Sequence, residues 1–220
     1  RAPRRMEAYA PRVKNPRLQR NGTNWKRSTW CACNGSRTSA IHGATWKRQR
    51  IVVVLPAAPL IPAKVALSHW NLGFPPNNGV CRILAQGMEV GDAYSTAIEQ
   101  VLAHPELQKW EYLLTIEHDN MPPVDGVLKL VARLDAHPEL SCVGGLYYTK
   151  GEGGVAQIWG DPADPVVNYR PQLPVTDALV ECCGTGMGFN LFRLKMFTDQ
   201  RLRRPWFHTL AGKRRSTFNR

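Results

Sequence analysis

The sequence predicts an α/β protein whose mostly parallel, twisted sheet has helices on both faces. Continuous β-branched runs alternate with segments of helical period, and this alternation is typical of strands joined by crossover helices. The 220 residues are 43% hydrophobic, which is enough to bury the core of one domain. We expect a basic, disordered segment over residues 1–48 and the α/β domain over residues 49–220.

The positive charge of the chain is concentrated at its start. Residues 1–50 hold 13 of the 29 Lys and Arg residues and one acid, Glu7. This accounts for the whole net charge of +12, and residues 51–200 are acidic. Basic residues interleaved with Trp25, Trp30 and Trp46 could stack on and neutralise single-stranded nucleic acid. The alternative is a solvated tail without a partner.

The elements follow in order from Gln49. A β-branched run closed by a proline indicates a strand buried on both faces, and apolar residues at helical spacing indicate helices that pack on the sheet. Strands are expected at 51–56, 79–86, 111–119, 140–149 and 155–160, and helices at 62–71, 89–104 and 123–137. The second helix should bury Ala93, Ala97, Ile98, Val101 and Leu102, and the third Val127, Leu128, Leu130, Val131 and Leu134.

The C-terminal part is less regular. Residues 161–174 read as a proline-punctuated loop, and residues 178–197 as a strand, a glycine-rich turn and a short helix. No apolar run approaches the roughly 18 residues of a membrane span, and the first thirty residues lack the apolar core of a signal peptide. We therefore expect a soluble, cytoplasmic protein.

The third strand ends on Glu117, His118 and Asp119, followed by two prolines. Ligands of open α/β sheets bind at the carboxyl ends of the strands. Side chains two apart on a strand share a face at a spacing of about 6 to 7 Å, so Glu117 and Asp119 should flank one ligand. Such carboxylates suit Mg²⁺ or Mn²⁺, especially with a diphosphate. The alternative is that Asp119 caps the turn and Glu117 is solvated.

The segments "LLTIEHDNMPP", "VGGLYYTKG", "VECCGTGMGFNLFR" and "RPWF" give the chain a family resemblance over roughly residues 50–208. It resembles the family 2-like glycosyltransferases of the GT-A type, particularly small phage and bacterial ones. The resemblance implies that a divalent metal, Mn²⁺ or Mg²⁺, binds at Glu117 and Asp119. It also implies a nucleotide-sugar donor and a hydroxyl acceptor as substrates.

The same resemblance implies further contacts. The backbone of Pro56, Ala57 and Ala58 is expected at the nucleotide, and Glu117 is expected to contact the donor through water or at a ribose hydroxyl. Gly144, Gly145 and Tyr148 are expected beside the donor, although paired glycines also serve close packing. The glycines of "GTGMGF" (Gly184, Gly186 and Gly188) are expected to let the backbone approach the acceptor.

The chain departs from the family pattern in several places. Tyr94 and Ser95 stand where relatives carry an Arg-Asn pair, and Glu117 replaces the usual first Asp. The acidic pair that follows "PWF" in the family, and that includes the catalytic base, is missing before Arg220. The catalytic residue therefore stays unassigned, and the sequence suggests an incomplete or degenerate enzyme. His208 is a candidate late metal ligand; the alternative is an ordinary surface histidine.

Two other functions are compatible with these residues. A nucleic-acid-binding protein would use the basic N-terminal segment and keep the α/β domain as an inactive scaffold. A nucleotidyltransferase would use the same metal and diphosphate, but the loop after the first strand, "PAAPLIP", has no glycine to cradle phosphates.

Overall fold

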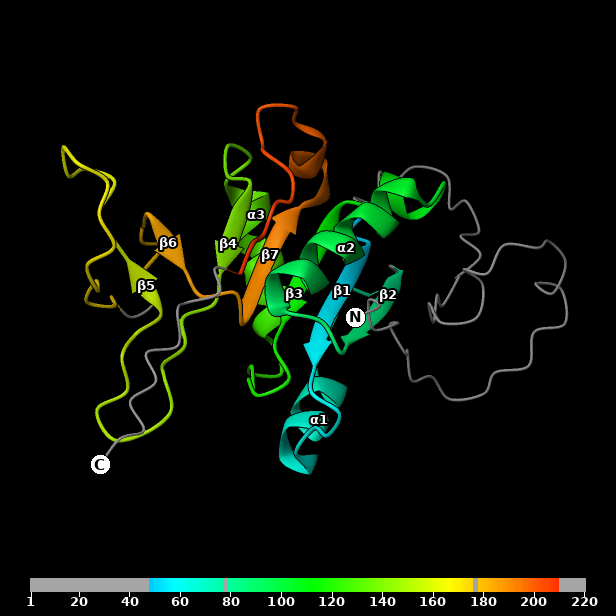
Figure 1. Ribbon diagram of the computed structural model, residues 1–220, viewed down its shortest axis with the longest axis horizontal. Coiled ribbons are helices and arrows are strands. Elements are labelled where there is room, and N and C mark those ends of the chain that lie inside the picture. The colour runs from blue at the N-terminus through cyan, green and yellow to red at the C-terminus, as the bar shows by residue number, and fades with distance from the viewer. Residues whose placement is uncertain (1–47, 77–78, 176–177, 210–220) are drawn as a thin grey trace, which may run out of the picture.

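The computed structural model describes residues 48–76, 79–175 and 178–209. Within these residues a five-stranded sheet has the order β2-β1-β3-β7-β4 (Figure 1). Its strands are β1 (Ile51–Ala57), β2 (Val80–Gln86), β3 (Tyr112–Ile116), β4 (Cys142–Gly144) and β7 (Phe189–Arg193). The helices are α1 (Ala63–Trp70), α2 (Val90–Ala103) and α3 (Gly126–Ala136), with short 3-10 turns η3 (Leu107–Lys109) and η4 (Leu194–Thr198).

The sheet is parallel except for one strand. β1 pairs in parallel with both β2 and β3, whereas β7 runs antiparallel between β3 and β4. β5 (Ile158–Trp159) and β6 (Gly184–Thr185) form a separate antiparallel pair. The mostly parallel sheet with helices on both faces confirms the predicted fold class.

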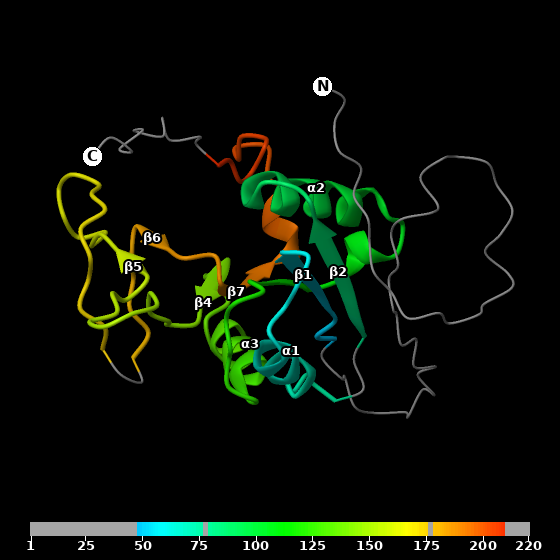
Figure 2. The same ribbon diagram turned by 60° about the horizontal axis from the view of Figure 1, so that its bottom comes forward.

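Helices cover the two faces of the sheet with separate cores (Figure 2). Because alternate side chains of a strand point to opposite faces, Val52 and Val54 of β1 join the core under α2, whereas Ile51 and Val53 join the core under α3. The continuous apolar run of the first strand is explained by burial on both sides.

The third helix differs from its prediction at one position. Val127, Leu130, Val131 and Leu134 are buried as expected, but Leu128 is 39% exposed. The reason is geometric: the helix has only one buried face, and Leu128 lies at its margin, near Gly73.

The segment after the glycine-rich turn was predicted to be a short helix. Its first part is a strand, β7, and the short 3-10 turn η4 follows directly after it. Leu191 packs on the α3 side of the sheet and Phe192 on the α2 side, which is the alternation of a doubly buried strand. The predicted strand before the turn is absent from the described residues, and the two residues of β6 belong to the glycine-rich segment itself. Short apolar runs do not distinguish a strand from a buried helix by their period, which explains the error.

The predicted strand over 140–149 is reduced to β4, and the one over 155–160 to β5. The segment predicted over residues 1–48, with its tryptophans and its nucleic-acid hypothesis, lies outside the described residues except for Arg48. In the described part of the chain, no helix has the length and apolar content needed to cross a membrane.

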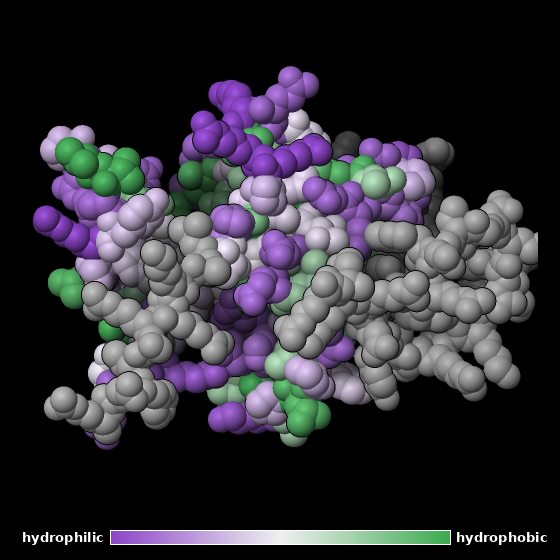
Figure 3. Space-filling view, viewed as in Figure 1, coloured by the Kyte–Doolittle hydropathy of each residue, from purple (hydrophilic) through white to green (hydrophobic). Residues whose placement is uncertain are grey.

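The exposed surface is largely hydrophilic, with scattered apolar patches (Figure 3). One patch lies over α1, which buries Val65 and leaves Leu67 and Trp70 exposed. Another lies in the loop after β5, where Val166 and Val167 are exposed.

Candidate functional site

The carboxyl ends of β1, β2 and β3 meet at one edge of the sheet, where α1 also lies (Figure 1). The predicted nucleotide-contacting residues Pro56, Ala57 and Ala58 stand at the end of β1. Gln86, the last residue of β2, donates from Nε2 to the carbonyl oxygen of Ala58 at 3.2 Å, which ties the two strand ends together. The fold therefore places the end of β1 on the same edge as the acidic segment after β3.

The acidic segment is a turn rather than a continuation of the strand. β3 ends at Ile116, and the amide of Asn120 donates to the carbonyl oxygen of Glu117 at 3.2 Å. The amide of Glu117 still pairs with the carbonyl oxygen of Gly188 at 3.1 Å, so the first acid remains fixed to the sheet. The expectation that Glu117 and Asp119 share a strand face is therefore wrong, because the backbone turns between them.

Helix α1 holds this turn from outside. His69 donates from Nε2 to the carbonyl oxygen of Asn120 at 2.8 Å, and the Ser68 hydroxyl donates to the carbonyl oxygen of Pro122 at 3.0 Å. Burial lowers the pKa of His69, against the smaller opposing effect of its bond to Asn120. A neutral imidazole that donates to a carbonyl thus positions the acidic turn.

The two acids have different electrostatic environments. Burial raises the pKa of Glu117, and the neighbouring charge of Asp119 raises it further. Among the described residues, the Glu117 carboxylate has no hydrogen-bond or ion-pair partner. Asp119 accepts a hydrogen bond from Nζ of Lys150 at 2.8 Å, and this bond is the largest cause of its lowered pKa. The sheet edge therefore presents the half-buried, unpaired carboxylate of Glu117 beside that of Asp119, which is already paired with the Lys150 ammonium.

Two tyrosines that sequence reasoning did not select lie close to these acids. Burial raises the pKa of Tyr94 and of Tyr147, and the charges of Glu117 and Asp119 raise both further. The Tyr94 hydroxyl donates to the carbonyl oxygen of Met187 at 3.3 Å. Both phenols therefore stay neutral at physiological pH, and Tyr147, which is only partly buried, can form a hydrogen-bonding wall of the site.

Tyr148, the residue selected from the sequence, points elsewhere: it is 51% exposed and forms an isolated bridge with Ala156. Successive side chains of an extended segment point to opposite sides, so that Tyr147 is directed inward and Tyr148 outward. The two adjacent tyrosines in the sequence indicated that one of them faces the site, but tertiary packing determines which one.

The glycines of the two predicted segments make room for side chains of the protein itself. A Cβ at Gly145 would overlap the ring of Phe189, and one at Gly186 or Gly188 would overlap Tyr147. Gly184 has only ordinary contacts. The close-packing alternative for Gly145 is thus observed. At Gly188, where the acceptor was expected to approach the backbone, the side chain of Tyr147 occupies the space instead.

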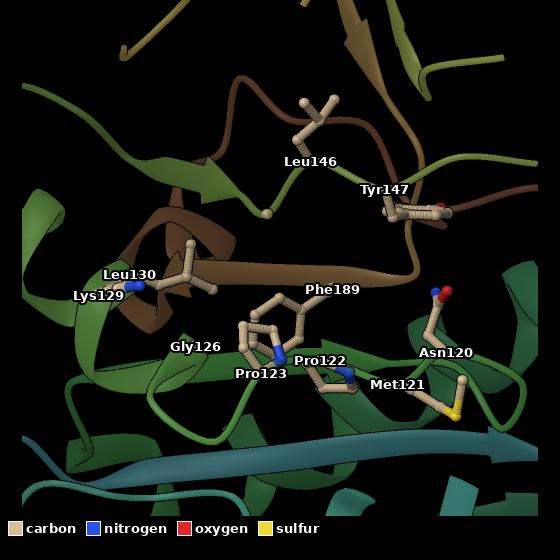
Figure 4. Close-up of a pocket in the computed structure, with 11 residues that line it drawn as sticks. Asn120, Met121, Pro122, Pro123, Gly126, Lys129, Leu130, Leu146, Tyr147 and Phe189 are labelled. Carbon is tan, nitrogen blue, oxygen red and sulfur yellow. The ribbon is translucent and has the colours of Figure 1, made fainter. Parts of the chain in front are cut away.

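A cavity of about 380 Å³ lies beside the acidic turn, between the start of α3 and the segment after β4 (Figure 4). Figure 4 shows the amide of Asn120 directed toward the ring of Tyr147 at one end. Its walls are mostly apolar and include Met121, Pro122, Pro123, Leu130, Leu146 and Phe189. Gly145, which was predicted to lie at the site, also lines the cavity. The cavity can take a small ligand next to Asp119, which directly precedes Asn120 in the chain.

The acidic turn provides few side chains that could bind a metal ion. The described residues contain no group of three or more His, Cys, Asp and Glu side chains that could hold a metal ion. His208 is exposed and does not join Glu117 and Asp119 in such a group; its neighbours Phe207 and Thr209 bond to Ser95 and Gly91 of α2. Two carboxylates nevertheless match Mg²⁺ or Mn²⁺ when substrate phosphates complete the coordination.

Comparisons with known proteins bear on the fold. No family profile matches the chain, and no curated protein matches it. Among solved structures, the chain is similar to the crystal structure of A197 from STIV, with a TM-score of 0.53 and 16% sequence identity. The similarity covers 73% of this chain and 72% of that chain. At this identity it shows the fold alone: a mixed α/β fold with a mostly parallel sheet, consistent with the GT-A-like fold expected from the sequence.

Proposed function

We propose that this protein is a glycosyltransferase that moves a sugar from a nucleoside-diphosphate donor to a hydroxyl acceptor, with Mn²⁺ or Mg²⁺ at Asp119. The observation that carries the proposal is the pair of carboxylates, Glu117 and Asp119, which follow the carboxyl end of β3 in a GT-A-like sheet and directly precede Asn120 of the cavity. Ligands of open α/β sheets bind at this edge, and a diphosphate needs cations to offset its charge.

In this proposal the ends of different strands bind different parts of the donor. The backbone at Ala57 and Ala58 receives the nucleoside, and Glu117 and Asp119 face the diphosphate. A bound cation would supply Lewis-acid stabilisation of the charge that develops on the departing nucleoside diphosphate. Glu117, which has no partner among the described residues, is free to bind a cation, directly or through water.

The cavity beside the turn is the proposed place of the acceptor. Its mostly apolar walls exclude water from the reacting hydroxyl, and Asn120 and Tyr147 provide polar groups at the end nearest the acids. The acceptor would therefore approach the donor from the α3 side, while the nucleoside lies toward β1 and β2.

The test is diphosphate binding measured by calorimetry. Uridine diphosphate and guanosine diphosphate are titrated with and without Mn²⁺ into the wild-type chain and into Asp119→Asn. We expect Mn²⁺-dependent binding of one diphosphate and a loss of at least tenfold in affinity in the variant, because a charged metal ligand is removed.

Asp125→Asn is the matched control, since Asp125 also pairs with a lysine, Lys129, at 2.9 Å, but lies at the start of α3. It should bind like the wild type. Binding that is absent for both diphosphates, or that is unchanged in Asp119→Asn, would overturn the proposed function.

A further inference from the structure

Lys150 lies on a turn that reaches across to the acidic segment. The amide of Thr149 donates to the carbonyl oxygen of Val155, and the amide of Val155 donates to the Thr149 hydroxyl, both at 2.9 Å. These two bonds close the base of a turn over residues 150–154. The side chain of Lys150 extends from this turn to Asp119, 31 residues earlier in the chain.

The turn is exposed and loosely packed around two of its glycines. Gly151 and Gly153 have φ angles of +111° and +69°, which other residues rarely adopt, and no atom lies within 4 Å of a Cβ placed at either. The ion pair is itself exposed, with 75% of the Lys150 side chain and 41% of the Asp119 side chain accessible. Such pairs are held weakly, so the ammonium can leave the carboxylate without disturbing the core.

Lys150 and a divalent cation compete for the same position. Nζ of Lys150 lies 2.8 Å from Oδ2 of Asp119, where a metal ion bound to this carboxylate would also be close. Two positive groups repel each other at such a distance. A cation bound through Oδ2 of Asp119 would therefore have to displace the ammonium.

We propose that Lys150 is a diphosphate-binding residue: it neutralises Asp119 in the free protein and transfers its hydrogen bonds to the donor's diphosphate when the donor binds with its cation. This inference rests on the proposed function. A lysine ammonium is a common phosphate ligand. Once it has left Asp119, the negatively charged diphosphate would be the nearest group with which it can pair. The transfer would draw residues 150–154 over the donor.

This role predicts effects of opposite sign in one variant, Lys150→Met, which keeps the length of the side chain and removes its charge. Mn²⁺ alone should bind about threefold more tightly, because no ammonium has to be displaced. In saturating Mn²⁺, the diphosphate identified by titration should bind about tenfold more weakly, because a charged donor is lost. Lys150→Arg should keep diphosphate affinity close to that of the wild type.

The measurements are Mn²⁺ binding by electron paramagnetic resonance and diphosphate binding by calorimetry. Lys109→Met is the matched control, because Lys109 also forms an exposed ion pair, with Glu106, and lies before β3 rather than after it. It should change neither affinity.

The outcomes separate the two proposals. If the wild type shows no Mn²⁺-dependent diphosphate binding, the proposed function fails, and the role of Lys150 fails with it. If the wild type binds but Lys150→Met binds the diphosphate as tightly as the wild type does, only the role of Lys150 is overturned. A Lys150→Met variant that binds Mn²⁺ and diphosphate both more weakly would also contradict the exchange.

Discussion

The amide of Gly188 donates a hydrogen bond to the phenol oxygen of Tyr147 at 2.9 Å. This bond joins the segment after β4 to the turn before β7, although the two residues are 41 positions apart. It brings the ring of Tyr147 against the backbone of Gly186 and Gly188, where any larger residue would collide with it. The end of the cavity nearest the acidic turn is therefore defined by packing between two distant segments.

Gly188→Ala should destabilise the protein by about 1–3 kcal/mol, because its methyl group would overlap both Tyr147 and the amide of Asn120. Urea denaturation gives the free energy of unfolding. Gly184→Ala is the control, since a Cβ there has ordinary contacts, with the nearest atoms at 3.4 Å. Equal stability of the two variants would show that Tyr147 and Asn120 can move aside freely.

Glu117→Gln should become more stable relative to the wild type as the pH rises from 4 to 7. The pKa of Glu117 is raised by burial, so its contribution to stability is fully present below the unfolded value of 4.5 and is lost as the pH rises through the folded value. The Glu117 carboxylate is also a proposed ligand of the cation, so we expect the variant to gain stability and to lose cation binding.

The measurement is the free energy of unfolding of both proteins across this pH range. Glu99→Gln, on the exposed face of α2, reports the effect of removing a carboxylate outside the site. The interpretation of Glu117 as an unfavourably buried charge is wrong if Glu117→Gln follows the wild-type pH dependence.

His69→Gln should lose less stability than the wild type when the pH falls below about 6.5. Burial lowers the pKa of His69, so its contribution is present above the unfolded value of 6.5 and is lost as the pH falls through the folded value. Thermal unfolding of both proteins at pH 7.5 and 5.5 measures the difference. Parallel losses in the two proteins would mean that protonation of His69 does not loosen the contact of α1 with the acidic turn.

The sequence alone determined the first strand, the main helices and the chemistry available at the sheet edge. β1 was identifiable because a continuous β-branched run closed by Pro56 suits a strand buried on both faces. α2 and α3 were identifiable because their apolar residues recur at helical spacing. The location of the acids at the sheet edge followed from their place at the end of the third strand, since parallel strands present their carboxyl ends at one edge, but the turn that carries them was not predicted.

Only the tertiary structure decided which side chains meet at that edge. β7 became an antiparallel strand because it is buried between β3 and β4, a circumstance that its short apolar run does not encode. Tyr147 rather than Tyr148 faces the site, and Lys150 reaches Asp119, because these contacts join segments that are distant in the chain. Local periodicity specifies how a segment folds, whereas contacts of this kind depend on how the whole sheet brings segments together.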